Sequence, residues 1–228
     1  MDISKNDVTL PSFTWNEIPP LTAAEIKAHT IPSKKLLADF EIVKAAFTTI
    51  HPGLYRYNTP ETIDQHLADL KMELSKDLTI PEAYIAFSRF TATIKCGHTY
   101  ANFWNQPMLV KRAISYQPDK IPFQFRIVEK RMIITESATP ELKKGMEVVA
   151  INGQPWEAIL PELLQLVKTD GANEGQQLVN LQLSGTSKFE SFDIYFPILF
   201  PLTRSCFPAM FLYPSFFILA PADSRFWR

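Results

Sequence analysis

Apolar residues recur at helical spacing in three consecutive stretches between residues 33 and 97. Within each stretch they lie three or four residues apart, which places them on one face of an α-helix. The predicted buried positions are Leu36, Phe40, Val43, Phe47 and Ile50 in the first stretch, Ile63, Leu67, Leu70 and Leu74 in the second, and Ala83, Phe87, Phe90 and Ile94 in the third. Three amphipathic helices with short links predict a small helical bundle.

Turn-forming residues mark the ends of these helices. The predicted N-caps are Ser33, Thr59 and Thr79, and Glu82 follows the last of them at capping-box spacing. The stretch "HPG" (51–53) is expected to end the first helix, because proline and glycine both stop helices. Gly97 is the predicted C-terminal stop of the third helix.

After residue 97 the helical period gives way to alternation. The segment "HTYANFW" (98–104) alternates, and residues 123–137 predict two strands around a charged tip. Another strand is predicted before Asn152-Gly153, because Asn-Gly is a strong signal for a tight turn. The remaining expected elements are a helix over 157–167, which contains Pro161, and a strand over 189–200.

The two ends of the chain lack a regular period. Residues 1–32 hold four prolines and predict an extended arm, with a short helix over 22–30. Residues 204–228 hold seven aromatic side chains and three prolines. Three interpretations of this apolar tail stay open: a membrane anchor, a buried irregular tail, and an end not selected to fold with the rest, which we favour.

Composition narrows the class of protein. Of the 228 residues, 46% are hydrophobic and 21% charged, which is typical of a globular protein. A net charge of −1 provides no basic field for nucleic acid. No proline-free apolar run of membrane-spanning length is present, so no ordinary membrane span is expected. No secretory signal opens the chain, so we expect a cytoplasmic protein unless a signal lies upstream.

No cofactor or metal site is predicted. Cys96 and Cys206, the two cysteines, make neither a disulfide framework nor a zinc site. The histidines, cysteines and carboxylates lack metal-ligand spacing, and no glycine-rich loop could cradle a phosphate.

His98 is the candidate catalytic residue, because an imidazole titrates near neutrality and suits general-base work. The alternative is a polar residue in a turn. Among the other histidines, His29 and His66 are interpreted as solvated residues on helix faces, and His51 as a residue that orders the "HPG" turn through its ring nitrogens.

A hydrolase also needs a nucleophile, and the sequence offers no clear one. It contains no G-x-S-x-G motif. Ser184 is interpreted as part of a hairpin turn. Cys96 lies two residues before His98, and at that spacing the two side chains diverge.

The stretch "KKGMEVVAINGQPW" (143–156) is more specific. A strand, a tight Asn-Gly turn and a following helix are the parts of a PDZ-like module. Such a module binds an extended chain beside the exposed edge of a sheet. The alternative is an ordinary hairpin with a helix.

Taken in order, these segments resemble the N-terminal region of the tail-specific (C-terminal processing) serine peptidases, in the tricorn-like branch. The resemblance covers about residues 36–203. It rests on "HPGLYRY" (51–57), "GHT" (97–99) and "GMEVVAINGQPWEAIL" (145–160), and on "DGANEGQQLVNLQ" (170–182) and "FDIYFPILFP" (192–201) as the link towards a catalytic domain.

The resemblance implies that His98 is the base of a serine-type peptidase that recognises polypeptide C-terminal tails. It also implies a periplasmic or envelope location. In this family the nucleophilic serine lies in an αβ-domain C-terminal to the PDZ-like part, and we expect that domain to be missing here. The chain alone is then expected to be inactive.

The predicted fold is α+β. Its parts are an extended arm (1–32), a helical domain (33–97), a PDZ-like domain with connecting strands (105–203) and an irregular apolar tail (204–228). Two alternatives to the peptidase fragment remain: a non-catalytic PDZ-like protein that binds peptides, and a product of a disrupted gene that has no function.

Overall fold

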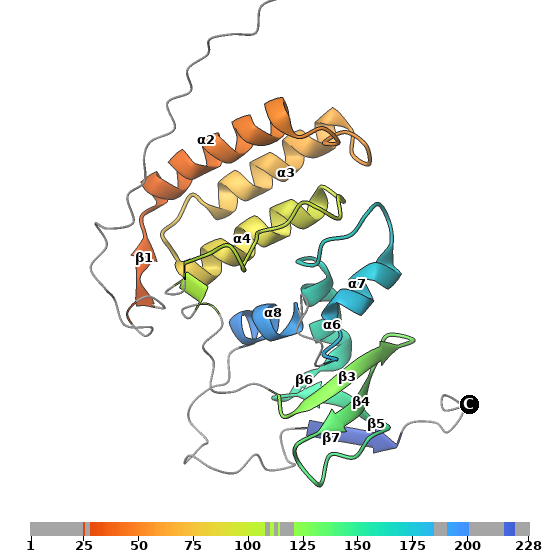
Figure 1. Ribbon diagram of the computed structural model, residues 1–228. Coiled ribbons are helices and arrows are strands. Elements are labelled where there is room, and N and C mark those ends of the chain that lie inside the picture. Colours follow the sequence, from red (N-terminus) through yellow and green to blue (C-terminus); the bar gives the residue numbers. More distant parts are fainter. Residues whose placement is uncertain are drawn as a thin grey trace, which may run out of the picture.

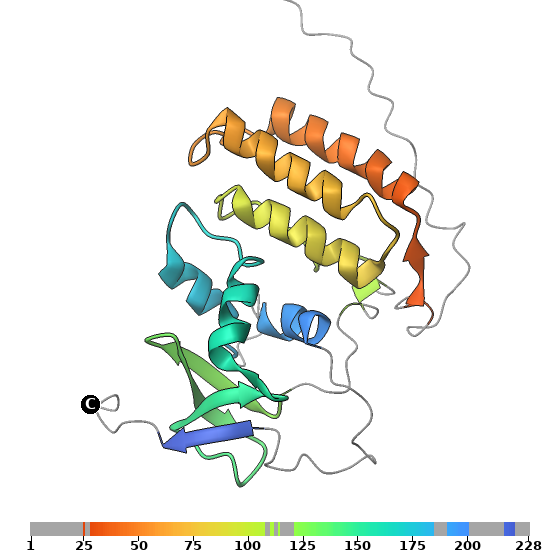
Figure 2. The ribbon, with the colours of Figure 1, turned by 180° about the vertical axis from the view of Figure 1, so that it is seen from behind.

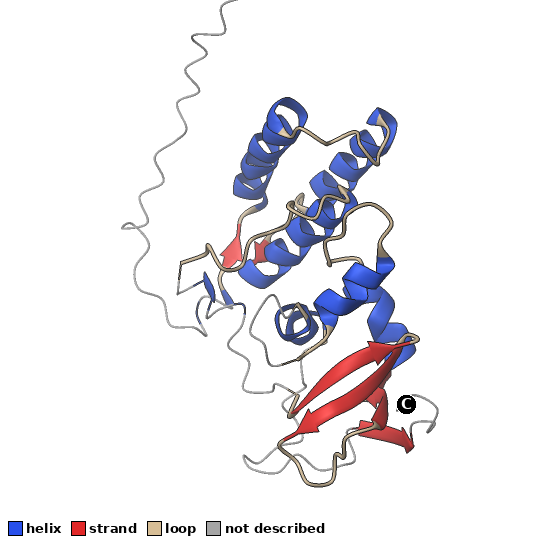
Figure 3. Ribbon diagram, turned by 45° about the vertical axis from the view of Figure 1, so that its right-hand side comes forward, coloured by secondary structure: helices blue, strands red, loops and turns tan. Residues whose placement is uncertain are grey.

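Helices and small antiparallel sheets are combined in one chain, which is compatible with the α+β class (Figures 1 and 3). The structure is a computed structural model that describes residues 25, 28–107, 110, 111, 114, 121–184, 191–200 and 217–221. For residues 217–221 it describes the backbone.

Three helices form a layer at one end of the molecule: α2 (Ser33–Ile50), α3 (Pro60–Glu73) and α4 (Ile80–Thr93) (Figures 1 and 2). Their buried side chains are Leu36, Phe40, Leu54, Ile63, Leu67, Leu70, Leu74, Leu78, Ala83, Ala86, Phe90 and Ile94. Most of the predicted positions are therefore buried. Ile50 is an exception at 76% exposed, because it is the last residue of α2.

Two of the three predicted N-caps are confirmed. The Thr59 side chain accepts a hydrogen bond from the backbone N–H of Thr62 at 3.2 Å, and Thr79 forms a capping box with Glu82. The prediction for Ser33 was wrong, because the helix already begins with Ser33 after Pro32. The backbone N–H of Ser33 donates instead to Oδ1 of Asp77 at 2.8 Å.

A two-stranded sheet lies beside the helix layer. Strand β1 (Thr30–Ile31) pairs antiparallel with β2 (Leu78–Thr79), directly before α4. This pairing ties the chain before α2 to the start of α4.

The second sheet has the order β3-β4-β5-β6, and β7 also pairs with β5. Its strands are β3 (Phe123–Val128), β4 (Arg131–Ser137), β5 (Met146–Ile151), β6 (Gln154–Pro155) and β7 (Phe217–Pro221). The predicted turn at Asn152-Gly153 is confirmed, with φ angles of 54° and 76°. Left-handed backbone of this kind is what a tight hairpin turn requires.

Three further helices pack with this sheet: α6 (Trp156–Leu164), α7 (Glu174–Leu181) and α8 (Phe192–Leu199). Helix α6 confirms the predicted helix around Pro161. The strand predicted over 189–200 was wrong, because its described part contains α8. Nearly every residue of α8 is apolar, so periodicity could not separate a buried strand from a buried helix.

Residues 98–104 form turns and irregular backbone, so the alternation in this segment did not indicate a strand. The segment 170–182 contains α7. The side chain of Asn173 caps this helix by accepting from the N–H of Gln176 at 3.0 Å.

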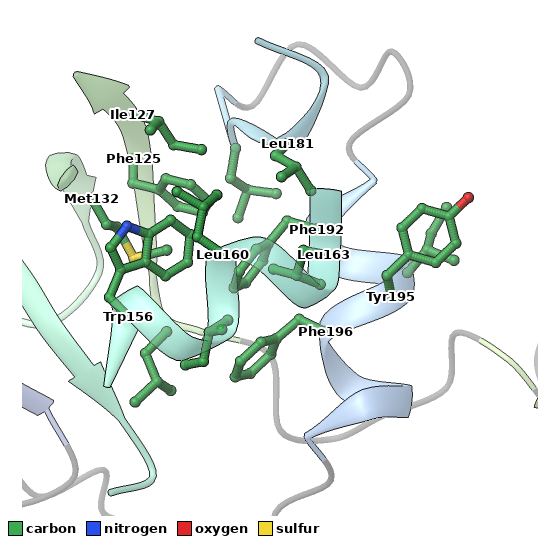
Figure 4. Close-up of a cluster of buried hydrophobic side chains, with 14 of the residues drawn as sticks. Phe125, Ile127, Met132, Trp156, Leu160, Leu163, Leu181, Phe192, Tyr195 and Phe196 are labelled. Carbon is green, nitrogen blue, oxygen red and sulfur yellow. The ribbon is translucent and has the colours of Figure 1, made fainter. Parts of the chain in front are cut away.

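The second sheet and helices α6, α7 and α8 are here called the sheet part of the molecule. Aromatic side chains of α8 fill its core (Figure 4). The Phe192 ring lies 4.9 Å from the Phe125 ring and 4.7 Å from the Phe196 ring. Tyr195 belongs to the same core, and Figure 4 shows it on the side of α8 away from Phe125 and Trp156. Its ring stacks 6.0 Å from the ring of Tyr84 in α4. Helix α8 therefore connects the sheet part to the helix layer.

Parts of the predicted arm and tail lie outside the described residues. The short helix predicted over 22–30 is described at Glu25 and Ala28, both helical, and at its last two residues. The predicted irregular tail needs a correction, because Phe217–Pro221 forms strand β7. Among the helices that the structure describes, none has the length and apolar character to cross a membrane.

Candidate functional site

His98 lies in a turn that follows α4. The helix ends at Thr93, and Lys95, with φ of 57°, takes the left-handed conformation that ends it. Gly97 is therefore not the helix stop that the sequence predicted. The amide of Asn58 donates to the backbone oxygen of Thr93 at 3.1 Å, which satisfies one of the carbonyls at the helix end.

The His98 side chain is exposed to solvent. The backbone N–H of Thr99 donates to the carbonyl oxygen of Cys96 at 2.9 Å, which closes the turn around His98. No hydrogen-bond partner for the His98 ring lies in the part of the chain that the structure describes. The ring nitrogens are thus accessible to a group that approaches from outside.

His51 contacts the turn around His98 through Thr99. Its Nδ1 accepts a hydrogen bond from the N–H of Gly53 at 3.2 Å, as the sequence predicted for this turn. A neutral ring that accepts at Nδ1 carries its proton on Nε2, so Nε2 donates to Oγ1 of Thr99 at 2.8 Å. The ring also stacks on Phe47 at 5.5 Å. His51 therefore joins "HPG" to "GHT" and works as a structural residue.

The segment 168–171 contacts the chain just before the turn that contains His98. The N–H of Gly171 donates to the carbonyl oxygen of Lys95 at 2.9 Å. Gly171 has φ of 66°, and a Cβ at this position would lie 3.2 Å from the Tyr57 ring. Both the backbone conformation and the packing therefore favour glycine here. Sequence reasoning missed this contact, although the Gly171 next to Asp170 was a visible turn signal.

Lys168 packs on the residue after the turn. Its ammonium lies 3.7 Å from the centre of the Tyr100 ring, which is a close cation–π contact. Burial lowers the pKa of Lys168, and nearby Cys96 acts in the opposite direction. Lys168 thus helps to fix the backbone after His98.

A small cavity lies between α4, the segment after His98 and α8. It measures about 40 Å³ and is lined by Tyr84, Tyr100, Ala101, Phe103, Trp104, Lys168, Asn180, Ser191, Ile194 and Tyr195. This volume holds water and no peptide. Burial raises the pKa of Tyr84 and of Tyr195, so both hydroxyls stay protonated. The Tyr84 hydroxyl donates to the carbonyl oxygen of Ala101 at 3.1 Å.

Among the described residues, no hydroxyl or thiol forms a hydrogen bond with the His98 ring. Cys96 lies against the core of the helix layer. Ser88 is 1% exposed within α4, and Ser184 lies at the end of a described segment. Over the same described ranges, no group of three or more histidine, cysteine, aspartate or glutamate side chains could hold a metal ion.

The outer edge of β3 is partly closed. The N–H of Phe125 donates to the carbonyl oxygen of Leu183 at 2.9 Å, and α7 packs beside this strand. An open hollow of about 480 Å³ lies at the start of β3, lined by Ile121, Pro122, Phe123, Gln124, Glu136, Ser137, Ala138 and Leu183. Glu136 is the charged residue of this lining, so the hollow offers little attraction to a terminal carboxylate.

Comparison with known proteins finds no matching family model, no matching curated protein and no matching solved structure.

Proposed function

We propose that the chain is the base-bearing, N-terminal part of a serine-type endopeptidase of the tail-specific kind, with polypeptide C-terminal tails as substrates. The exposed, unbonded imidazole of His98 on a braced turn is the observation that carries this proposal. The ring of His51, which is hydrogen-bonded at both nitrogens, provides the contrast.

In this role His98 would take the proton of a serine hydroxyl as the oxygen attacks the peptide carbonyl. The imidazolium would then return the proton to the leaving amine. The bonds of Thr99 to Cys96 and to His51 hold the backbone on both sides of His98, which limits the positions that its ring can take.

The first test is genetic. The coding DNA downstream of the codon for Phe200 is read in all three frames, and we expect a segment that encodes a strand, a serine and a helix in succession. Intergenic DNA after a clean stop would contradict the peptidase proposal.

The second test is enzymatic. The purified chain is incubated with a denatured protein that ends in a free carboxylate, and we expect no cleavage, because a base alone leaves the covalent route closed. Cleavage that is lost in His98→Ala and kept in His29→Ala would show that the chain carries its own nucleophile. The proposal that these 228 residues supply only the base would then be wrong.

The hollow at the start of β3 favours a second candidate, a non-catalytic PDZ-like module that binds peptides. Binding of a labelled peptide with a free C-terminal carboxylate is compared with binding of its amidated form. Clearly weaker binding of the amide is the result that this candidate predicts. Equal affinities would count against carboxylate capture.

A further inference from the structure

The two edges of β5 have different partners. Val148 pairs with Met132 of β4 and also with Leu219 of β7. Ala150 pairs with Pro155 of β6 and also with β7. A strand residue has one neighbour on each edge, so β4 and β6 share one edge of β5 and β7 takes the other.

Strand β7 covers this outer edge along the whole length of β5, from Met146 opposite Pro221 to Ile151 opposite Phe217 (Figures 1 and 2). The pairing is antiparallel, with one irregularity between Val148 and Ala150. This partner lies far along the chain from β5, after α8 and the further residues 200–216.

Without β7, β5 would present a row of unpaired N–H and C=O groups, which is a template for another strand. The side chains of Val148, Ala150 and Ile151 are 0%, 5% and 2% exposed. Glu147 is the one charged residue of the strand, and Arg131 of β4 binds it. Strand β5 therefore has no unpaired charged side chain that would disfavour pairing with an apolar strand.

The observed partner shows which chemistry fits. Segment 217–221 reads "FILAP", and the six residues "SFFILA" (215–220) carry no charge and no proline. Such segments strongly favour extended pairing. Because backbone pairing depends on the strand and not on its covalent link, another polypeptide with this composition can make the same ladder.

We propose that the outer edge of β5 is a strand-addition site for extended, uncharged, apolar segments of other polypeptides, which the chain's own segment 217–221 fills in cis. The site does not depend on His98 or on peptidase activity. A tethered strand competes at an effective concentration in the millimolar range, so a free peptide binds the intact chain weakly.

The test uses the full chain with Ile218→Pro and Leu219→Pro together. Successive N–H groups of a strand point to opposite edges, so two adjacent prolines remove one that faces β5 in either register. A fluorescent peptide that copies residues 215–222 is titrated against this variant and against the unchanged chain. We expect the variant to bind the peptide about tenfold more tightly or better.

Hydrogen exchange locates the site. The amides of residues 146–151 are expected to exchange faster in the double-proline variant, and the added peptide is expected to restore their protection. Ser205→Pro with Cys206→Pro is the matched control, because it adds two prolines outside the paired segment. This control should behave like the unchanged chain. A peptide with prolines at the two positions that correspond to 218 and 219 should not bind.

Three outcomes would overturn the proposal. The first is unchanged exchange at residues 146–151 in the double-proline variant. The second is equal peptide affinity for the variant and the unchanged chain. The third is protection that rises with protein concentration and not with peptide, which would assign the edge to a second copy of the chain. If two prolines prevent folding, Leu219→Lys, which keeps every backbone N–H, should give the same order of affinities with a smaller difference.

Discussion

Two histidines lie beside the same turn, and their bonding assigns them different roles. The His51 ring is bonded at both nitrogens and stacked on Phe47, whereas the His98 ring is exposed. The residue type alone could not separate a structural imidazole from a free one. The contact between His51 and Thr99 had no sequence signal, because it joins two segments that helices α3 and α4 separate.

The two histidines should therefore differ in their effect on stability. His51→Ala leaves Thr99 and the N–H of Gly53 without their partner, so we expect it to lower the free energy of unfolding by about 1–3 kcal/mol. His98→Ala removes an exposed side chain that has no hydrogen bond to any described residue, and should change the free energy of unfolding by less than about 0.5 kcal/mol. Urea denaturation measures both variants. Equal destabilisation would mean that His98 is a structural residue.

His66 gives the fold a dependence on pH. Burial lowers its pKa below the usual 6.5, Asp69 opposes this effect and Lys95 adds to it. The unfolded chain therefore binds the proton more readily than the folded chain, so stability is lost as the pH falls from about 6.5 towards the lowered value. The half-buried position of His66 also corrects its interpretation as a solvated residue.

Urea denaturation at pH 7.5 and at pH 5.5 tests this expectation. We expect His66→Gln to reduce the loss of stability between these two pH values. An NMR titration of the His66 ring should give a midpoint below 6.5. An unchanged pH dependence in His66→Gln would contradict the assignment to this residue.

At the scale of elements, helix α4 begins with a reciprocal cap. The N–H of Thr79 donates to Oε2 of Glu82 at 2.7 Å, and the N–H of Glu82 donates to Oγ1 of Thr79 at 3.4 Å. Helix α2 lacks a cap of this kind, because Pro32 at its N-cap position has no side chain that accepts a hydrogen bond. The two helices therefore depend differently on the residues that the sequence marked as caps.

Thr79→Ala should lower the free energy of unfolding by about 1 kcal/mol, because it leaves an N–H at the start of α4 without an acceptor. Ser33→Ala is the matched control. It should change stability by less than about 0.5 kcal/mol, because Ser33 lies inside α2 and alanine favours a helix. Thermal unfolding followed by circular dichroism compares them. A larger loss of stability in Ser33→Ala than in Thr79→Ala would show that Ser33 caps α2.

Sequence reasoning found the elements that carry local signals. Thr59, Thr79 and Asn152-Gly153 each combine a residue type with a spacing that has one structural meaning, and each prediction is confirmed. Helix α8 has no such signal, since its apolar residues fit a buried strand and a buried helix equally. Strand β7 was missed because its partner β5 is distant in the sequence, and such a pairing leaves no local signal. The tail also shows neither helical spacing nor alternation of its apolar residues.

At the scale of the whole molecule, α4 belongs to both cores. Its Ala86 and Phe90 lie in the core of the helix layer, whereas Ile85 is 7% exposed within the core of the sheet part. The stacking of Tyr84 on Tyr195 of α8 adds a second contact between the two parts. Apolar contacts on opposite faces of one helix couple the two cores, so unfolding one core should expose part of the other.

Native-state hydrogen exchange in low concentrations of urea should therefore give the same opening free energy for the buried part of α2, around Phe40, and for the paired part of β4. Ile85→Ala removes the α4 side chain that lies in the sheet core, and should make the two parts open separately, with the less stable part lowered by about 2–5 kcal/mol. Ile42→Ala is the matched control, because Ile42 is 49% exposed on α2. It should leave both opening free energies equal. If the two parts of the unchanged chain already open separately, α4 does not transmit stability, and the helix layer folds without the sheet.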